Sequence, residues 1–165
     1  MDASPRDLAR IALLAALIAA LGLVPPVYLP FLAAVPVTAQ TLGIMLAGVL
    51  LGPVRGALAV LLFLFVVALG APFLAGGRGG LGVFAGPTVG FLVGWPLGAF
   101  VTGLVMRRLT ALPAAVAAFV ASVAGGVVVV YAVGVPGIAL MTGLDLTAAL
   151  AGSAAFLPGD FLKAG

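Results

Sequence analysis

The sequence predicts an all-α protein, a transmembrane helical bundle that forms a single integral membrane domain over residues 1–165. Two observations lead to this expectation. Hydrophobic residues make up 65% of the chain and charged residues only 7%, whereas soluble domains are about 45–50% apolar and roughly 25% charged. Several apolar runs also approach the roughly 17–25 residues that a helix needs to cross a bilayer. We therefore expect lipid to surround the chain.

Five apolar runs are expected to form helices: Leu8–Val24, Ala39–Leu51, Arg55–Gly70, Thr88–Met106 and Ala114–Val133. Gly52 and Pro53 mark a tight turn between the second and third runs. Because proline is favoured in the first turn of a helix, Pro53, Pro87 and Pro113 are expected to begin the third, fourth and fifth helices.

The last part of the chain is expected to differ from these spans. Leu146–Leu157 is too short to cross a bilayer and is predicted to lie on the surface. A last helix should begin near Pro158. Since the sequence stops at Gly165, we expect a six-helix architecture whose last helix is truncated.

Two long connections and the arginines predict an orientation. Pro25–Val37 holds four prolines and should be extended or irregular, and Ala71–Gly86 contains the glycine-rich run GGRGGLG. With the N-terminus in the cytoplasm, both connections and the expected Val135–Asp145 connection lie outside. Arg78 is then outside, and the positive-inside rule is met by five cytoplasmic arginines: Arg6, Arg10, Arg55, Arg107 and Arg108.

The residue types exclude most catalytic chemistry. The chain has no cysteine and no histidine, so it has no disulfide, no Ser-His-Asp or Cys-His set and no His-metal site. It also lacks a Gly-x-x-x-x-Gly-Lys-Ser/Thr loop for nucleotide phosphates. The net charge of +3 forms no patch for nucleic acid. We expect neither an enzyme nor a resident cofactor or metal.

Asp160 and Lys163, the only lysine, are the main candidates for a binding site. Ionisable groups at membrane depth are costly, which makes them functional candidates. A carboxylate only accepts hydrogen bonds and an ammonium offers three donors, so together they suit a solute with N–H donors and a carbonyl or carboxylate. The alternative is a purely structural ion pair, with Asp160 capping the helix.

Other candidates lie near the expected outer face. Arg78, beside Gly77 in the glycine loop, suits an anion, or it is a solvated loop charge. Gln40 and Thr41 lie at the outer start of the second span, where Gln40 either binds an amide-like ligand or caps the helix. Five aromatic residues either wall an apolar pocket or face lipid and core: Phe73, Phe84, Phe91, Trp95 and Tyr131.

Small residues recur at helical spacing on two helices. Ala12, Ala16 and Ala20 repeat on the first span, and a glycine ladder runs into the fourth: Gly82, Gly86, Gly90, Gly94 and Gly98. In lipid, small residues let helix backbones approach closely. These faces either pack within the chain or, for the alanines, dock a partner protein.

Three stretches in this order resemble one family: PVTAQTLGIMLAGVLLGPVRGALAVLLFL, GAPFLAGGRGGLGVFAGPTVGFLVGW and FLPGDFLKA. They are similar to the biotin-specific S components of energy-coupling factor (ECF) transporters, the BioY family. The resemblance covers about Val35 to Ala164. The chain departs from it at Phe91, where the family more often has tyrosine.

The resemblance implies a six-helix protein of the bacterial plasma membrane that binds biotin at its outer face, with Asp160 and Lys163 at the ligand. It also implies outer loops that close over the vitamin. The alanine face would contact a transmembrane T subunit linked to two ATPase subunits, which use the ATP. Alternatives are a solitary transporter, an S component for another vitamin, and a non-transporting membrane scaffold.

Overall fold

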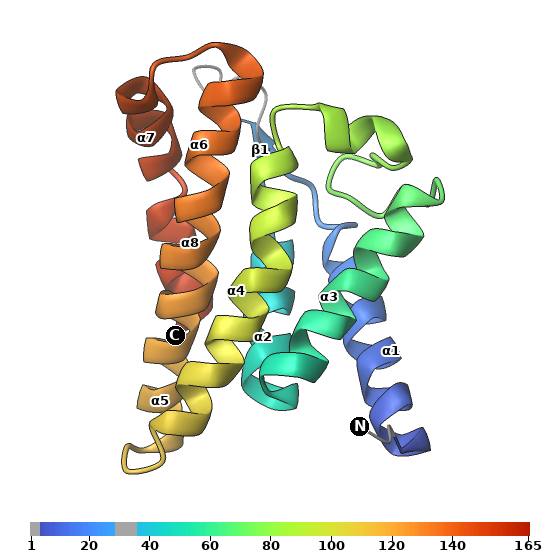
Figure 1. Ribbon diagram of the computed structural model, residues 1–165, viewed down its shortest axis with the longest axis vertical. Helices are drawn as coiled ribbons and strands as arrows, with labels where there is room; N and C mark the ends of the chain where they lie inside the picture. Colours follow the sequence, from blue (N-terminus) through green and yellow to red (C-terminus); the bar gives the residue numbers. More distant parts are fainter. Residues whose placement is uncertain (1–3, 29–35) are drawn as a thin grey trace.

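The computed structural model describes residues 4–28 and 36–165, which form a bundle of helices (Figure 1). The helices are α1 (Pro5–Leu21), α2 (Gln40–Leu51), α3 (Pro53–Ala68), α4 (Val89–Arg108), α5 (Ala114–Ser122), α6 (Val130–Thr142), α7 (Leu146–Ala154) and α8 (Leu157–Ala164). A 3-10 helix, η1 (Leu81–Ala85), precedes α4, and a π-helix, η2 (Val123–Val129), joins α5 to α6. The prediction of an all-α fold is confirmed.

The strands in the described residues form one short antiparallel pair, β1 (Val27–Tyr28) with β2 (Pro36–Val37). The expectation of an extended connection at Pro25–Val37 is therefore confirmed at both of these places. The middle of that connection, residues 29–35, lies outside the described residues.

The predicted helix starts are close to the observed ones. Pro53 is the first residue of α3, Pro113 directly precedes α5, and α8 begins one residue before Pro158. Gly52 makes the turn before α3 with a φ of 78°, a left-handed value that favours glycine. At the start of α1, the hydroxyl of Ser4 accepts a hydrogen bond from the N–H of Asp7, as expected of an N-cap.

The predicted connection at Val135–Asp145 is wrong, because α5, η2 and α6 form a continuous helical segment from Ala114 to Thr142. Pro136 lies inside α6 and does not end it. Membrane helices tolerate proline, since local π-type adjustments and neighbouring helices satisfy the backbone groups that it frees. The helix ends instead at Gly143, whose φ of 71° is left-handed.

Helix α4 lies in the middle of the bundle and packs against α2, α3 and α6 (Figure 1). Its glycines Gly90, Gly94 and Gly98 face α6 and η2, so the interpretation of the glycine ladder as packing within the chain holds for these three. A Cβ atom at Gly90 would lie 2.8 Å from the Cα atom of Gly137. The small residues thus permit a helix contact that any side chain would prevent.

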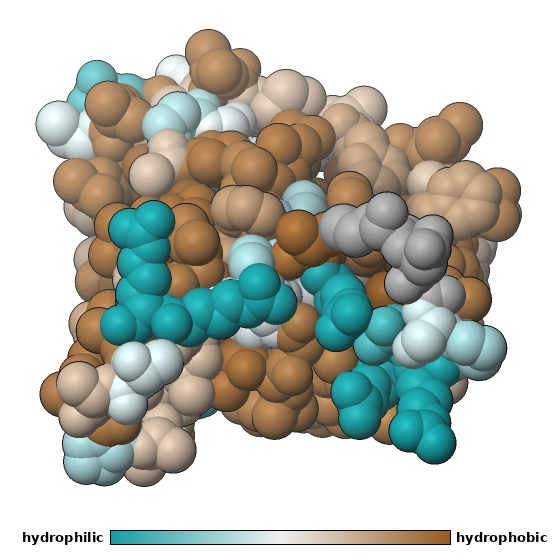
Figure 2. All heavy atoms as spheres, turned by 60° about the horizontal axis from the view of Figure 1, so that its bottom comes forward, coloured by the Kyte–Doolittle hydropathy of each residue, from teal (hydrophilic) through white to brown (hydrophobic). Residues whose placement is uncertain are grey.

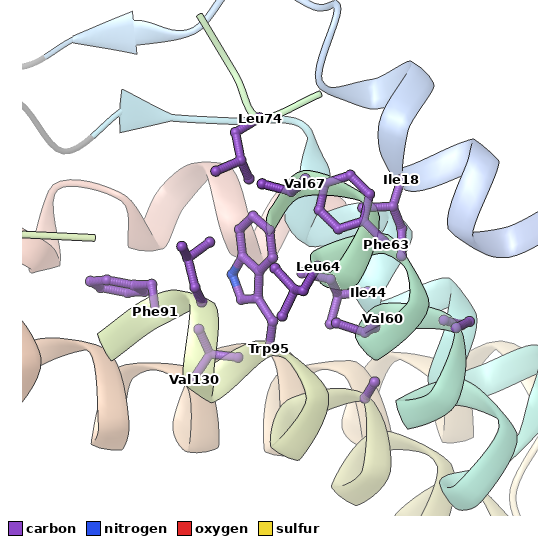
Figure 3. Packing of buried hydrophobic residues seen from close by; sticks show 14 of the residues in the cluster. Ile18, Ile44, Val60, Phe63, Leu64, Val67, Leu74, Phe91, Trp95 and Val130 are labelled. Carbon is purple, nitrogen blue, oxygen red and sulfur yellow. The ribbon is translucent and has the colours of Figure 1, made fainter. Parts of the chain in front are cut away.

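The core lies where the first four helices meet (Figure 3). Ile18 from α1, Ile44 from α2 and Phe63 from α3 are almost fully buried. The rings of Phe63 and Trp95 lie with their centroids 6.3 Å apart. This packing fixes Trp95, on α4, at one side of a cavity that is described below.

Hydrophilic and hydrophobic residues are separated along the bundle. Hydrophilic residues gather on the end that comes forward in Figure 2, and hydrophobic residues cover much of the flanks. This end carries the N-terminus and the α2–α3 and α4–α5 turns (Figure 1). It presents exposed arginines: Arg6, Arg10, Arg55, Arg107 and Arg108. One of them, Arg55, pairs with Asp7 of α1 at 2.9 Å.

Two helical segments of the described chain are long and apolar enough to cross a membrane, Val89–Arg108 and Ala114–Thr142. Helices α2 and α3 are shorter but also apolar. Large apolar side chains are openly exposed on several helices, for example Leu13, Phe65 and Leu140. Exposed apolar surface of this extent is unfavourable in water and is expected of a surface in contact with lipid.

Candidate functional site

A cavity lies toward the end of the bundle opposite the arginines, between the starts of α2, α4, α6 and α8 and the loop before η1. Its enclosed volume is about 50 Å³. The lining residues are Thr38, Gln40, Thr41, Leu74, Arg78, Thr88, Phe91, Leu92, Trp95, Val130, Tyr131, Phe156 and Asp160. Many of the candidates that the sequence singles out are therefore brought together here.

The carboxylate of Asp160 is the most connected group of the cavity wall. The residue is only 4% exposed. Its Oδ1 atom accepts from Lys163 Nζ at 2.8 Å and from the Thr41 hydroxyl at 2.9 Å, and Oδ2 accepts from the Tyr131 hydroxyl at 2.6 Å. One side chain on α8 thereby joins α2 and α6.

The ammonium of Lys163 uses all of its donors within the protein. Besides Asp160, Nζ donates to the backbone carbonyl of Thr38 at 2.6 Å and to the Thr41 hydroxyl at 3.0 Å. Lys163 does not line the cavity. By contrast, the carboxylate of Asp160 offers about four acceptor positions and uses three, so one remains for a ligand.

The short helix α8 explains how these two residues meet. Pro158 stands in its first turn, where proline is favoured, and Asp160 follows within the same turn. A carboxylate there is favoured by the partial positive charge of the helix N-terminus. Three positions later, Lys163 lies on the same face of the helix. The buried carboxylate is thus paired with a cation, as a buried charge requires.

Three of the five candidate aromatic residues line the cavity. Phe91, Trp95 and Tyr131 do so, and the ring of Phe91 meets that of Tyr131 edge to face with centroids 5.7 Å apart. Phe73 and Phe84 lie elsewhere, in grooves between α1 and α3 and between α3 and α4. The prediction of an aromatic wall therefore fits the first three residues only.

Gln40 is fully buried, and its amide is occupied by backbone groups. Nε2 donates to the carbonyls of Ile18 at 3.1 Å and Phe73 at 3.0 Å. Oε1 accepts from the N–H of Ala75 at 3.0 Å. The Gln40 amide therefore does not cap α2; it connects the start of this helix to α1 and to the glycine loop.

Arg78 and Gly77 belong to a tight turn in the glycine loop. Leu74 and Arg78 exchange backbone hydrogen bonds at 3.0 and 3.2 Å, and between them Gly76 and Gly77 have φ values of 80° and 71°, which favour glycine. Arg78 lines the cavity, whereas Gly77 serves the turn and does not. Arg78 Nε donates to the Ala75 carbonyl at 3.2 Å.

Thr88, Leu74 and Phe156 line the cavity although they are not among the residues expected at the site. Thr88 is 6% exposed, and its hydroxyl has no hydrogen-bond partner within the described part of the chain. The sequence carried one signal for it, because Pro87 predicts a helix start that places the next residues at the mouth of the bundle. Leu74 and Phe156 carried no comparable signal.

The alanine face of α1 lies at the surface of the bundle. Ala12, Ala16 and Ala20 are exposed, and Ala12 and Ala16 border, together with Ala15 and Ala19, an open groove between α1 and α3. The three alanines are therefore accessible at the surface of the described chain.

The chemistry of the site is that of binding. The cavity combines one buried carboxylate, one guanidinium, several hydroxyls and a wall of aromatic and aliphatic side chains. No group of three metal-ligating side chains exists among residues 4–28 and 36–165. This arrangement suits a mostly apolar small molecule with a few polar groups.

Comparisons with known proteins identify the family. The biotin transporter BioY of Rhizobium etli is 55% identical over 98% of this chain and 88% of its own length. That of Rhodobacter capsulatus is 51% identical over 96% and 87%. A crystal structure of the S component for biotin from an ECF-type ABC transporter matches with a TM-score of 0.90 and 33% identity, covering 96% of this chain and 85% of that one. The model of the BioY family matches residues 1–165, and the chain therefore belongs to the BioY family.

Proposed function

We propose that this chain is the biotin-binding S component of an ECF importer, driven by ATP hydrolysis in partner subunits. The relatives named as biotin transporters and the solved S component for biotin support this function. It is a transport function and not an enzymatic one. The observation that carries the proposal is the buried carboxylate of Asp160 in the wall of a mostly apolar cavity.

Asp160 accepts a hydrogen bond from the ureido ring of biotin. This ring carries two N–H donors and one carbonyl, and Asp160 retains an acceptor position after its three protein hydrogen bonds. Lys163 and Thr41 hold the carboxylate in place. The Thr88 hydroxyl, which has no partner in the described residues, is available to the ureido carbonyl.

The remaining parts of the vitamin find matching surfaces. The thioether ring and the aliphatic chain pack against Phe91, Trp95 and Tyr131. The carboxylate of biotin meets the guanidinium of Arg78, which lies in the turn that Gly77 shapes. Phe84 lies outside this site. Gln40 holds the glycine loop through its hydrogen bonds and does not itself bind the vitamin.

Binding requires the cavity to open. Small-molecule sites enclose roughly 300–1,000 Å³, whereas this cavity encloses about 50 Å³. Leu74 and Arg78 of the glycine loop line the cavity on its outer side, so movement of this loop is the step that admits biotin. The proposal therefore includes a loop that opens and then closes over the vitamin.

The partners and the orientation follow from the alanine face and from the arginines. Ala12, Ala16 and Ala20 form an exposed strip of small residues that suits the close approach of another transmembrane helix, here one of the T subunit. Five exposed arginines lie at the end of the bundle with the N-terminus. By the positive-inside rule this end faces the cytoplasm of a bacterium, and the cavity faces outward.

Binding of biotin to the purified protein tests the substrate, with desthiobiotin and thiamine as competitors. We expect saturable binding of biotin, competition by desthiobiotin and none by thiamine. Binding of thiamine without binding of biotin would reassign the chain to another vitamin. Absence of binding of all three compounds would favour a scaffold. Vesicle uptake with and without the ATPase module then tests the partners.

A further inference from the structure

We propose that Gln40 is a positioning residue that fixes the turn Leu74–Arg78 to α1 and so directs the Arg78 guanidinium into the cavity. Its consequence is selectivity for a ligand with an anionic tail. The inference rests on the proposed function for the identity of the ligand, but the positioning of the turn can be measured without any ligand.

The first step is that one amide holds two separate parts of the chain. Gln40 Nε2 donates to the carbonyl of Ile18 in α1 and to that of Phe73 in the glycine loop, and Oε1 accepts from the N–H of Ala75. Gln40 is 0% exposed, so water does not compete for these groups. Both amide hydrogens and one acceptor position are engaged, as a fixed support requires.

The second step leads from Gln40 to the guanidinium through a single residue, Ala75. The N–H of Ala75 is held by Gln40, and the C=O of Ala75 accepts from Arg78 Nε at 3.2 Å. Backbone bonds between Leu74 and Arg78 close the turn. The position of the Gln40 amide therefore sets the orientation of the Arg78 guanidinium through these two hydrogen bonds.

The third step is the roof of the cavity. The two loop groups that Gln40 holds, Phe73 C=O and Ala75 N–H, flank Leu74. Leu74 is 1% exposed and reaches from the loop toward the ring of Trp95 (Figure 3). Gln40 thus fixes two groups of the same turn, the apolar side chain of Leu74 and the guanidinium of Arg78.

The fourth step is the close contact with α1. A Cβ atom at Gly22, directly after α1, would lie 2.1 Å from the Phe73 carbonyl oxygen and 2.9 Å from Gln40 Nε2. Gly22 has an ordinary φ of −68°, so the lack of a side chain matters for space and not for backbone strain. Gly22→Ala therefore disturbs the same support without changing the amide.

The test compares biotin with its methyl ester, which lacks the negative charge, on the full chain in detergent. Arg78→Gln should lower the preference for biotin over the ester about tenfold, as expected for the loss of a charge-assisted hydrogen bond. Gln40→Met should lower it about fivefold, and the double variant should lower it no further than Arg78→Gln. If Gln40→Met does not fold, Gly22→Ala serves in its place, with the same expectation.

Gly103→Ala is the matched control, because its Cβ atom would lie 2.3 Å from the backbone of Gly52 at the other end of the bundle. We expect it to leave the preference for biotin unchanged. Equal loss of both ligands in Gln40→Met, or an additive double variant, would overturn the positioning of Arg78.

Hydrogen exchange of the Ala75 amide provides the readout without ligand. Gln40→Met should accelerate this exchange at least about tenfold, because Gln40 Oε1 is the acceptor of this N–H. An unchanged exchange rate of the Ala75 amide would overturn the inference that Gln40 holds this turn in place. If the wild-type chain bound no biotin while Ala75 exchange responded, the proposed substrate would fail and the fixed turn would stand.

Discussion

Replacing Asp160 by asparagine tests the central group of the site, and the structure allows its effect to be divided into two parts. The carboxylate accepts three hydrogen bonds, from Lys163, Thr41 and Tyr131, at 2.6 to 2.9 Å. In Asp160→Asn the charge is lost, and an NH₂ group replaces one of the accepting oxygens. Either the Tyr131 hydroxyl or the Lys163–Thr41 pair then faces a donor.

The stability part follows from the ion pair. The side chains of Lys163 and Asp160 are 18% and 6% exposed, and removing one partner of a buried pair costs about 3–5 kcal/mol. Asparagine keeps one acceptor oxygen, and Lys163 keeps its hydrogen bonds to Thr38 and Thr41. We therefore expect the free energy of unfolding to fall by an amount near the lower end of this range, about 3 kcal/mol. A thermal unfolding measurement in detergent would record it.

The binding part follows from the ureido contact. A hydrogen bond to a charged group contributes about 1.5–3 kcal/mol, so the affinity of Asp160→Asn for biotin should fall about 10- to 150-fold. Titration calorimetry at a temperature well below unfolding measures this separately. Asp145→Asn, which changes an exposed acid outside the cavity, is the control and should bind as the wild type does.

A double variant separates the two parts. Asp160→Asn with Lys163→Met removes both charges, so it should recover stability relative to Asp160→Asn, since no unpaired cation remains. It should not recover affinity. Binding by Asp160→Asn within twofold of the wild type would refute the role of this carboxylate, whatever its stability.

Three further predictions concern the cavity wall, the helix contact and pH. Thr88→Val should fold as the wild type does, since its hydroxyl has no partner in the described residues, but should bind biotin about fivefold more weakly by calorimetry. Gly90→Ala places a Cβ atom 2.8 Å from the Cα atom of Gly137. It should lower the free energy of unfolding by roughly 1–3 kcal/mol, as measured by thermal unfolding. Hydrogen bonds from the side chain and backbone of Thr147 lower the pKa of Asp145. These bonds therefore stabilise the start of α7 fully at a pH above the pKa of an unfolded aspartate, about 3.9. The stabilisation is lost as the pH falls through the lower pKa that Asp145 has in the folded chain. Exchange of the Thr147 amide should therefore show an extra acceleration at low pH that Asp145→Asn abolishes.

Several features of the protein were predictable because they depend on short stretches of sequence. The scarcity of charge indicates lipid as the surroundings, and Pro53 and Pro158 mark helix starts whatever the helices pack against. The three-residue spacing places Asp160 and Lys163 on one helical face. The expected connection at Val135–Asp145 was wrong, because Pro136 lies inside α6 and a packed membrane helix can contain a proline.

The arrangement of the site depended on the packing of the helices. Gln40 bonds to groups 22, 33 and 35 residues away, and Tyr131 reaches Asp160 across 29 residues. Phe84 and Phe91 are seven residues apart and equally aromatic, yet only Phe91 lines the cavity. Sequence patterns determine which helices form and which side chains are out of place in lipid. The choice of partner for each buried polar group is made by the rotation and depth of one helix against another, and this is decided only when the whole chain packs.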